Sequence, residues 1–472
     1  MSVARKLAER IVGSDYKDLP SEAVRWSCIG VLDTIGVALA GSIEDAPLIV
    51  GKTLDLSGSD GPSLIFGTRK RTRCLDAALV NATSAHALDF DNATNTMFGH
   101  ASATIIPALL AAGEEFGANG KEVLLAHVVG FEAGARIGKG VNLYHYEKGW
   151  HPSSTLGVFG VAAACARLLQ LSVTETETAL ALSTSLASGI KANFGTMTKP
   201  LHVGQCARNG LMAALLARKG FTANPDALEH SQGFLNVFNG PGHYDVGQIV
   251  DGWGAPFDIV APGACYKQYP CCASTHAAVD AALRLVERHG PFEGHKVKRV
   301  DSWTAATRLA HTNRPHPDSS LDAKFSVQYC IARALLHGKV VLDHFEGDAY
   351  RESAVCELLP RIHAMACSDG QFPPGNLLGA EVKVTLYDGS ALSAKLDRPI
   401  GRTSANPITA AQMMSKFESC ASRVILPESV GRLYRLIESF EEVASVREFT
   451  TLLESATSRS DDRKRTREHD SV

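Results

Sequence analysis

The sequence has few features of a membrane-bound or nucleic-acid-binding protein. The apolar runs at residues 104–112 and 158–166, among its longest, are shorter than the roughly 20 residues that a membrane span needs. The formal net charge of -3 provides no field that would attract nucleic acid. The first ten residues mix acidic and basic side chains and contain no apolar signal segment. We therefore expect a soluble, cytoplasmic protein without a membrane or nucleic-acid partner.

Paired metal-binding cysteines are also missing. The 11 cysteines are scattered without any C-x-x-C spacing, and only Cys265, Cys271 and Cys272 lie close together. An odd number of unpaired cysteines is typical of reduced thiols and offers no iron–sulfur or zinc site. The glycines form neither a G-x-G-x-x-G motif after a strand nor a P-loop. The sequence therefore predicts chemistry without a metal or an organic cofactor.

The apolar pattern predicts more than one domain, as the length of 472 residues suggests. Apolar residues recur at helical spacing from residue 3 to about residue 262, interrupted by short connections that contain glycine. Alanine and glycine are frequent in residues 157–166 and 179–189, where small side chains allow helices to approach closely. This part is predicted to be a compact all-helical domain.

The pattern changes after residue 262. Residues 296–303 alternate like a strand, and residues 380–387 and 390–396 flank an Asp-Gly turn, which is typical of a β-hairpin. Residues 325–336 and 349–365 have helical spacing, as do three segments after residue 401. We predict a mainly α protein with a helical domain of residues 1–262 and 400–456, a smaller α+β domain of residues 263–399, and a charged, disordered tail of residues 457–472.

Two acids and two histidines interrupt an apolar, alanine-rich stretch at residues 86–103. The helical spacing on both sides predicts that Asp89, Asp91 and His100 lie on a connection between two buried helices. Ordered loops on a rigid scaffold commonly carry catalytic side chains, because the scaffold fixes them while substrate can still reach them. Helix capping by Asp91 or Asn92, together with a structural histidine, explains the same residues equally well.

Three further segments place histidines, lysines and cysteines in apolar or glycine-rich surroundings. Taken singly, each has an ordinary interpretation, such as a solvated lysine, a structural histidine or a buried cysteine. The segments are residues 149–157, with His151 before a proline; residues 191–204, with Lys199 and His202; and residues 266–276, with Lys267, Cys271 and His276.

Taken together and in order, these motifs resemble the MmgE/PrpD family, over residues 3–455. The resemblance implies a large helical domain built from both chain ends plus an α+β lid, usually as a homodimer without metal or organic cofactor. Family members include 2-methylcitrate dehydratases, cis-aconitate decarboxylases and an iminodisuccinate epimerase, so it also implies a small polycarboxylate substrate. The matching motifs are Ala87-Leu-Asp-Phe-Asp91 with Gly99-His100, residues 129–138, Gly149-Trp-His-Pro, Thr198-Lys-Pro-Leu-His and Tyr269-Pro-Cys-Cys.

The resemblance also implies a set of site residues. The decarboxylase branch of the family has a threonine in the first motif, together with the aspartate and the histidine. The interval from Asp89 to His100 is one residue longer here and resembles the epimerase branch, and we assign this threonine to Thr94. The candidate catalytic residues are His100, Asp89, Asp91 and Lys199, and the candidate substrate-binding residues are Thr94, His151, His202 and Lys267.

The resemblance implies a lyase first, as a dehydratase ahead of a decarboxylase. Lysines and histidines neutralise the substrate carboxylates where water is excluded. His100, oriented by Asp89 or Asp91, serves as the acid or base, and Lys199 takes the other role. An epimerase that removes and returns one proton is the alternative, and a carboxylate-binding protein without turnover is the alternative from another class.

Overall fold

The computed structural model describes residues 1–55 and 60–458, and the chain divides into two compact units. The helical unit comprises Met1–Tyr266, Thr403–Ala405 and Thr409–Val472. The mixed unit comprises Lys267–Arg402 and Asn406–Ile408. The chain thus leaves the helical unit four residues beyond the predicted boundary at 262 and returns to it after the mixed unit.

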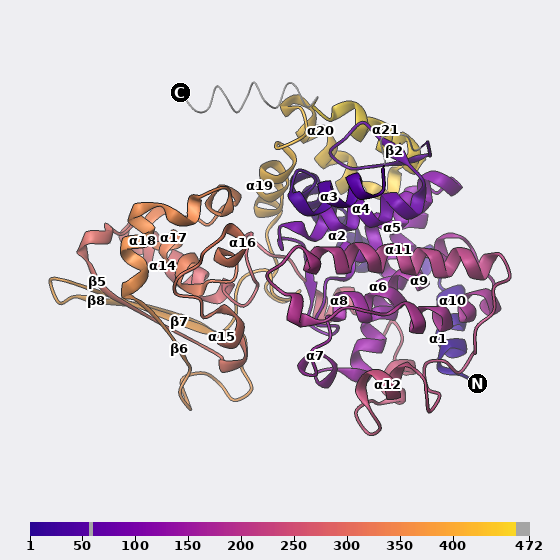
Figure 1. The fold of residues 1–472 in the computed structure, drawn as a ribbon, viewed down its shortest axis with the longest axis horizontal. Helices are drawn as coiled ribbons and strands as arrows, with labels where there is room; N and C mark the ends of the chain where they lie inside the picture. The colour runs from indigo at the N-terminus through magenta and orange to yellow at the C-terminus, as the bar shows by residue number, and fades with distance from the viewer. Residues whose placement is uncertain (56–59, 459–472) are drawn as a thin grey trace. The chain divides into compact units, whose positions relative to one another are not determined.

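Helices make up most of the helical unit, and segments from both ends of the chain contribute to it (Figure 1). Among its C-terminal helices, α19 packs against α2 and α21 packs against α5. Two short antiparallel strand pairs complete the unit: β1 (Ser63–Leu64) with β2 (Arg71–Thr72), and β3 (Ala93–Thr94) with β4 (Ala264–Cys265). The helices are α1 (Val3–Gly13), α2 (Ser21–Gly41), α3 (Asp45–Thr53), α4 (Cys74–Ala87), α5 (Ala101–Phe116), α6 (Gly120–Val141), α7 (Tyr144–Glu147), α8 (Pro152–Thr155), α9 (Gly157–Leu168), α10 (Val173–Leu186), α11 (Thr198–Arg218), α12 (Phe234–Asn239), α13 (Val246–Val250), α19 (Ala410–Ala421), α20 (Pro427–Glu438) and α21 (Val446–Ala456).

Helix α2 combines length with an apolar composition. By length and composition it is long enough to cross a membrane, and 83% of its apolar window is buried within the structure, as in the core helix of a globular protein. The prediction that the apolar runs are too short for a membrane span therefore overlooked α2, because polar residues such as Asp33 interrupt its sequence. A Cβ at Gly36 would lie 3.0 Å from the ring of Phe417, so the absence of a side chain allows α19 to approach α2 closely.

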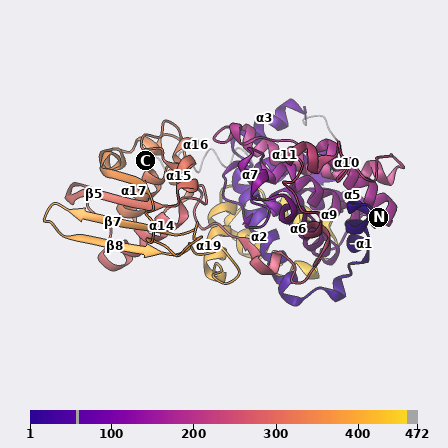
Figure 2. The ribbon, with the colours of Figure 1, turned by 90° about the horizontal axis from the view of Figure 1, so that it is seen from below.

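The mixed unit contains a four-stranded sheet in the order β6-β5-β7-β8. Helices α14 and α17 contact strands of this sheet, and the buried side chains of Ala380, Val382 and Val384 alternate with more exposed ones along β7. Figure 2 shows β5, β7 and β8 running side by side. The elements are α14 (His276–His289), β5 (Val297–Thr304), α15 (Ala306–Thr312), α16 (Ser320–Ala323), α17 (Val327–His337), α18 (Ser353–Leu358), β6 (Ile362–Ala366), β7 (Ala380–Leu386) and β8 (Ala391–Leu396).

Strand β6 differs from the sequence-based prediction, which made residues 349–365 helical. The helix α18 ends at Leu358, and Ile362–Ala366 pairs in parallel with β5. A five-residue strand has little periodicity of its own, and its parallel neighbour is about 60 residues away in the sequence, so pairing rather than local pattern decides its conformation. The predicted hairpin is present as β7 and β8, joined at Asp388-Gly389.

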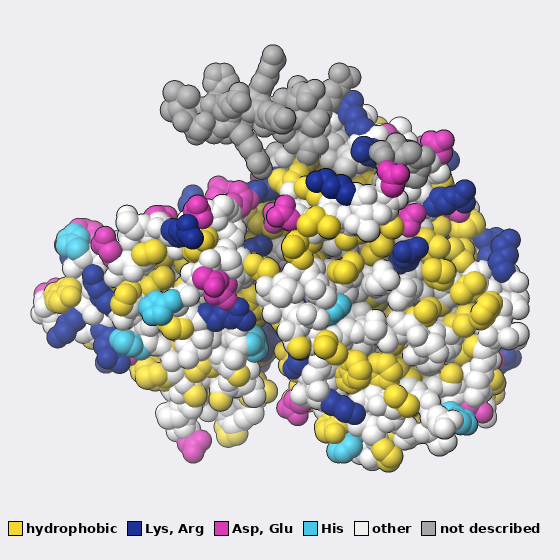
Figure 3. Space-filling view, in the orientation of Figure 1, with side chains coloured by type: hydrophobic (Ala, Val, Ile, Leu, Met, Phe, Trp, Pro, Cys, Tyr) yellow, Lys and Arg dark blue, Asp and Glu magenta, His cyan; other side chains and the backbone are white. Residues whose placement is uncertain are grey.

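Basic and acidic side chains are interspersed over each unit on the face drawn in Figure 3. Neither sign gathers there into a large patch. This distribution agrees with the small net charge of -3.

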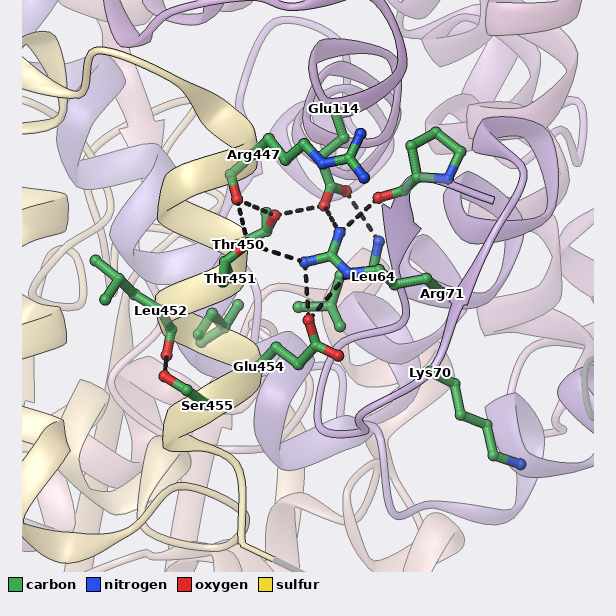
Figure 4. A network of polar contacts seen from close by, with 12 residues as sticks. Leu64, Lys70, Arg71, Glu114, Arg447, Thr450, Thr451, Leu452, Glu454 and Ser455 are labelled. Carbon is green, nitrogen blue, oxygen red and sulfur yellow. Dashed lines mark hydrogen bonds and ion pairs between the residues drawn. The ribbon is translucent and has the colours of Figure 1, made fainter. Parts of the chain in front are cut away.

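A polar network holds the C-terminal helix α21 against the rest of the helical unit (Figure 4). Arg71 lies between two carboxylates, 2.7 Å from Glu114 and 2.9 Å from Glu454, and Thr450 donates a hydrogen bond to Glu114. Burial raises the pKa of Glu114, while the hydrogen bonds and Arg71 oppose the rise. The network therefore links α5, β2 and α21.

The first two residues of the predicted disordered tail are ordered. Thr457 forms a bridge with Ile425 and its carbonyl accepts hydrogen bonds from Arg69, while the backbone N–H of Ser458 donates to Val424. The pattern of apolar residues missed this segment because backbone groups, not apolar side chains, make most of its contacts. The remainder of the predicted tail, residues 459–472, lies outside the described residues.

Candidate active site

The loop between α4 and α5 carries most of the candidate residues. Helix α4 ends at Ala87, and Asp89 adopts the left-handed backbone region with a φ of 52°. Few residues other than glycine adopt this region, and such strain is found preferentially at functional sites. Asp89, Asp91 and His100 all lie on this connection between two buried helices, where the sequence pattern indicated them.

The carboxylate of Asp91 contacts two imidazoles. Its Oδ1 atom lies 3.0 Å from Nδ1 of His86, and its Oδ2 atom lies 2.9 Å from Nδ1 of His100. Burial by itself would raise the pKa of Asp91, but the attraction of His100 and His86 holds that pKa well below its usual range. Asp91 is therefore an anion that fixes the orientation of both rings.

His86 belongs to this cluster, although the sequence analysis did not select it as a site residue. Its ring is buried at the end of α4, and burial lowers its pKa to about 4, so it is neutral at pH 7. With its Nδ1 against Asp91, its Nε2 is buried and has no hydrogen-bond partner among the described residues. His86 is one of the two histidines noted in residues 86–103, but helical periodicity assigned it to the flank that forms α4 rather than to the loop.

Lys199 approaches the loop from the first turn of α11. Its Nζ atom lies 2.8 Å from Oδ1 of Asp89, and the same carboxylate oxygen lies 4.0 Å from Nε2 of His100. Lys199 also lies 5.2 Å from the centre of the Phe194 ring. Asp89 therefore stands between a nearly buried ammonium group and the imidazole of His100.

His151 and His202 extend the group of imidazoles. Their Nδ1 atoms lie 3.1 Å apart, and the ring of His151 stacks on that of His86 with 5.9 Å between centres. Burial, followed by the neighbouring His86 and Lys199, lowers the pKa of His151 well below its usual value. Burial and the charge of Lys199 also lower the pKa of His202. Both rings therefore present neutral hydrogen-bonding groups at pH 7.

Gly99 explains how His100 reaches this position. A Cβ at Gly99 would lie 2.6 Å from the backbone nitrogen of Ser153, so any side chain would push the loop away from the start of α8. This approach allows the backbone N–H of His100 to donate to Oγ of Ser153. The loop is therefore anchored to the same helix start that follows His151.

The remaining two candidates have different surroundings. The hydroxyl oxygen of Thr94 accepts hydrogen bonds from the backbone N–H groups of Thr96 and Met97, so it closes a local turn. Lys267 is the first residue of the mixed unit and is 1% exposed. The substrate-binding roles of Thr94 and Lys267 stay predictions.

Four of these residues also offer ligand atoms for a metal ion. Atoms of His86, Asp89, Asp91 and His100 lie within 4.8 Å of one another. Two imidazole nitrogens with two carboxylates suit zinc or a similar divalent ion. In this structure the carboxylates instead contact Lys199 and the two imidazoles, so an ion would compete with these contacts.

Comparison with known proteins assigns this chain to a family. The model of the MmgE/PrpD N-terminal domain matches residues 5–246, and that of the MmgE/PrpD C-terminal domain matches residues 269–442. The chain belongs to the MmgE/PrpD family. It is 29% identical to the cis-aconitate decarboxylase of Homo sapiens over 464 residues, which cover 96% of this chain and 94% of that protein. It is 27% identical to the cis-aconitate decarboxylase of Aspergillus terreus over 461 residues, which cover 92% of each.

Proposed function

We propose that this member of the MmgE/PrpD family is a lyase that acts on a citrate- or aconitate-like polycarboxylate by acid–base chemistry. The observation that carries the proposal is the Asp91 carboxylate, which contacts Nδ1 of both His86 and His100. Beside it lies the Asp89–Lys199 pair. Positioned imidazole and ammonium groups transfer protons and bind carboxylates. The cis-aconitate decarboxylases among its relatives support the same class of substrate.

The contacts of Asp91 suggest a role for each imidazole. With Nδ1 of each ring against the Asp91 carboxylate, Nε2 is the nitrogen that we propose to exchange protons with a substrate. His100 is the better placed of the two for substrate, because its side chain retains 13% exposure while that of His86 is fully buried. We assign the principal acid–base role to His100 and the orienting role to Asp91.

The other candidate residues receive complementary roles. Lys199, held beside His100 by Asp89, binds a substrate carboxylate and exchanges the second proton. Thr94, His151, His202 and Lys267 are proposed to bind the remaining substrate oxygens. The mechanism that we propose assigns no step to a metal or an organic cofactor.

Decarboxylation and dehydration begin at the same group of residues but break different bonds. In decarboxylation the bond to one carboxyl carbon breaks, carbon dioxide leaves, and the resulting carbanion takes a proton. In dehydration a base removes the proton next to a carboxylate, and an acid protonates the departing hydroxyl. From the sequence, dehydration is expected ahead of decarboxylation, whereas the relatives compared above are cis-aconitate decarboxylases and favour decarboxylation.

An NMR assay of the purified protein separates these reactions. Citrate, 2-methylcitrate and cis-aconitate are each incubated with the wild-type protein and with His100→Gln, which keeps a polar side chain but cannot act as a base. Loss of water or of carbon dioxide by the wild type alone would support the proposal. Equal conversion by both proteins would contradict the assignment of His100.

Epimerisation is the second candidate, because the interval between Asp89 and His100 is one residue longer than in the decarboxylase branch. The same assay with one enantiomer of iminodisuccinate in D₂O tests it. Inversion accompanied by deuterium uptake would favour an isomerase. Binding of a polycarboxylate without any product would favour a non-catalytic carboxylate-binding protein.

We also propose that the protein is a homodimer, as the family resemblance implies. Light scattering coupled to size-exclusion chromatography tests this point, because the monomer has a mass of 50.3 kDa. A dimer would elute with twice that mass.

A further inference from the structure

A buried ion pair connects a helix from the N-terminal part of the chain with a helix from its C-terminal part. Asp33, near the middle of α2, accepts a hydrogen bond of 2.6 Å from Nζ of Lys416 on α19. The side chains are 0% and 4% exposed, and 383 residues separate them in the sequence. Burying two charges costs free energy that their mutual attraction often fails to recover, so a pair of this kind calls for a reason beyond stability.

The two side chains use their other contacts to hold the candidate active-site loop. Oδ2 of Asp33 accepts hydrogen bonds from the backbone N–H of Asn92, at 2.9 Å, and from its side-chain amide, at 3.0 Å. Nζ of Lys416 donates to the backbone carbonyl of Phe90, at 2.7 Å, and lies 4.0 Å from the centre of the Phe90 ring. The residue between Phe90 and Asn92 is Asp91.

We propose that Asp33 and Lys416 are positioning residues that act through Asp91. Both oxygens of Asp91 contact the imidazoles of His86 and His100, so the backbone on either side sets the place of this carboxylate. Asp33 fixes the backbone after it, and Lys416 fixes the backbone before it. The role in turnover rests on the proposed function of His100, whereas the effect on the geometry of the two histidines does not.

The direct test uses Lys416→Met and the double variant Asp33→Asn/Lys416→Met. The double variant removes both charges and so avoids leaving an unpaired buried charge, which would destabilise the fold strongly. We expect kcat to fall roughly 10²-fold, as for a misplaced catalytic group, with a smaller change in KM. Misplacing an acid–base group should also change the pH–rate profile, which a purely structural loss would leave unchanged.

The matched control is Glu114→Gln, in the network of Figure 4. Glu114 is also a buried charge paired with a cation and links a C-terminal helix to the same unit, but its contacts are with Arg71, Thr450 and the backbone of Leu64. We expect this variant to lose thermal stability while its kcat and pH–rate profile stay unchanged at temperatures well below the melting temperature. Equal losses of kcat in both variants would reduce the Asp33–Lys416 pair to a structural role.

A second measurement does not depend on turnover. Imidazole ¹H–¹⁵N spectra report which ring nitrogen carries the proton, and the signals of His86 and His100 are assigned by single replacement of each. We expect both signals to change in Asp33→Asn/Lys416→Met and to stay unchanged in Glu114→Gln. Wild-type histidine spectra in a folded double variant would overturn the inference. Absence of turnover in the wild type would refute the proposed function. The spectra would still test whether Asp33 and Lys416 position the two histidines.

Discussion

Nζ of Lys199 lies 2.8 Å from Oδ1 of Asp89, and a turn of the backbone with a φ of 52° at Asp89 aims this carboxylate back at the helix start that carries the lysine. A substrate carboxylate therefore meets an ammonium group that already has an anionic partner. The contact couples the binding of substrate to the position of Asp89.

Replacing each member of this pair should have opposite effects on substrate affinity. In Asp89→Asn the negative charge that repels a polycarboxylate is gone, so we expect KM to stay equal or fall while kcat falls. In Lys199→Met the binding cation is gone and Asp89 is left without it, so we expect KM to rise at least tenfold. Steady-state kinetics with the active polycarboxylate decide the matter. A rise of KM in both variants would contradict this account of Asp89.

The two imidazoles on Asp91 should contribute unequally to turnover. His100→Gln should lower kcat by roughly 10²–10⁴-fold, as for a lost general acid or base. His86→Gln should lower kcat less, because glutamine can still donate a hydrogen bond to Asp91. His145→Gln is the control, since His145 is a buried histidine whose ring nitrogens contact Asn239 and Thr155 rather than Asp91. Single-turnover rates that rank His86 above His100 would reverse the assignment.

Stability should decline in mild acid because of His127. Its ring contacts Ser27 and Ser102, and burial lowers its pKa from 6.5 to about 3. The unfolded chain takes up a proton below about pH 6.5 while the folded protein does not, so the stability that His127 contributes is complete above this pH and is lost as pH falls toward 3. Between pH 6.5 and 5 we expect its share of the loss to reach roughly 2 kcal/mol.

The variant His127→Gln tests this origin, because glutamine can bond to both serines but does not titrate. Urea unfolding at pH 7, 6 and 5 should give a flatter dependence on pH for the variant than for the wild type. An unchanged slope would assign the acid sensitivity to other groups, such as His145, whose pKa burial lowers to about 4.

Truncation should be tolerated after Ser458 but not after Glu454. The longer chain retains the hydrogen bonds of Arg69 to Thr457 and of Ser458 to Val424. The shorter chain loses them together with the buried Ala456, which should cost about 2 kcal/mol or more. Melting temperatures of the two truncated proteins and of the full chain provide the measurement. A large loss in the protein ending at Ser458 would mean that residues 459–472 stabilise the fold.

Activity should survive removal of metal ions. In this structure Lys199, His86 and His100 contact the carboxylates that an ion would require, and the proposed mechanism assigns it no step. Exhaustive treatment with a chelator, followed by an assay with and without added zinc or iron, checks this. Loss of activity that zinc restores would make the four-residue cluster a metal centre.

The sequence predicted the reactive loop but only part of its surroundings. Asp89, Asp91 and His100 were recognisable because charged residues stand out in an alanine-rich stretch. His86 was noted in the same stretch but not selected, because its contact with Asp91 depends on the end of α4 and the reversal of the chain at Asp89. The role of Lys416 could not be predicted for another reason. Helix α19 has an ordinary amphipathic pattern, and nothing in that pattern reveals a partner 383 residues earlier.

The Asp33–Lys416 contact can form only late in the synthesis of the chain. Asp33 is synthesised 383 residues before its partner, an interval of roughly 20–80 s at 5–20 residues per second. During that time α2 carries a carboxylate that must remain hydrated or be covered by a chaperone, because its ammonium group does not yet exist. A fragment of residues 1–266 contains every candidate site residue except Lys267, but it has to expose part of its central helix or bury an unpaired charge.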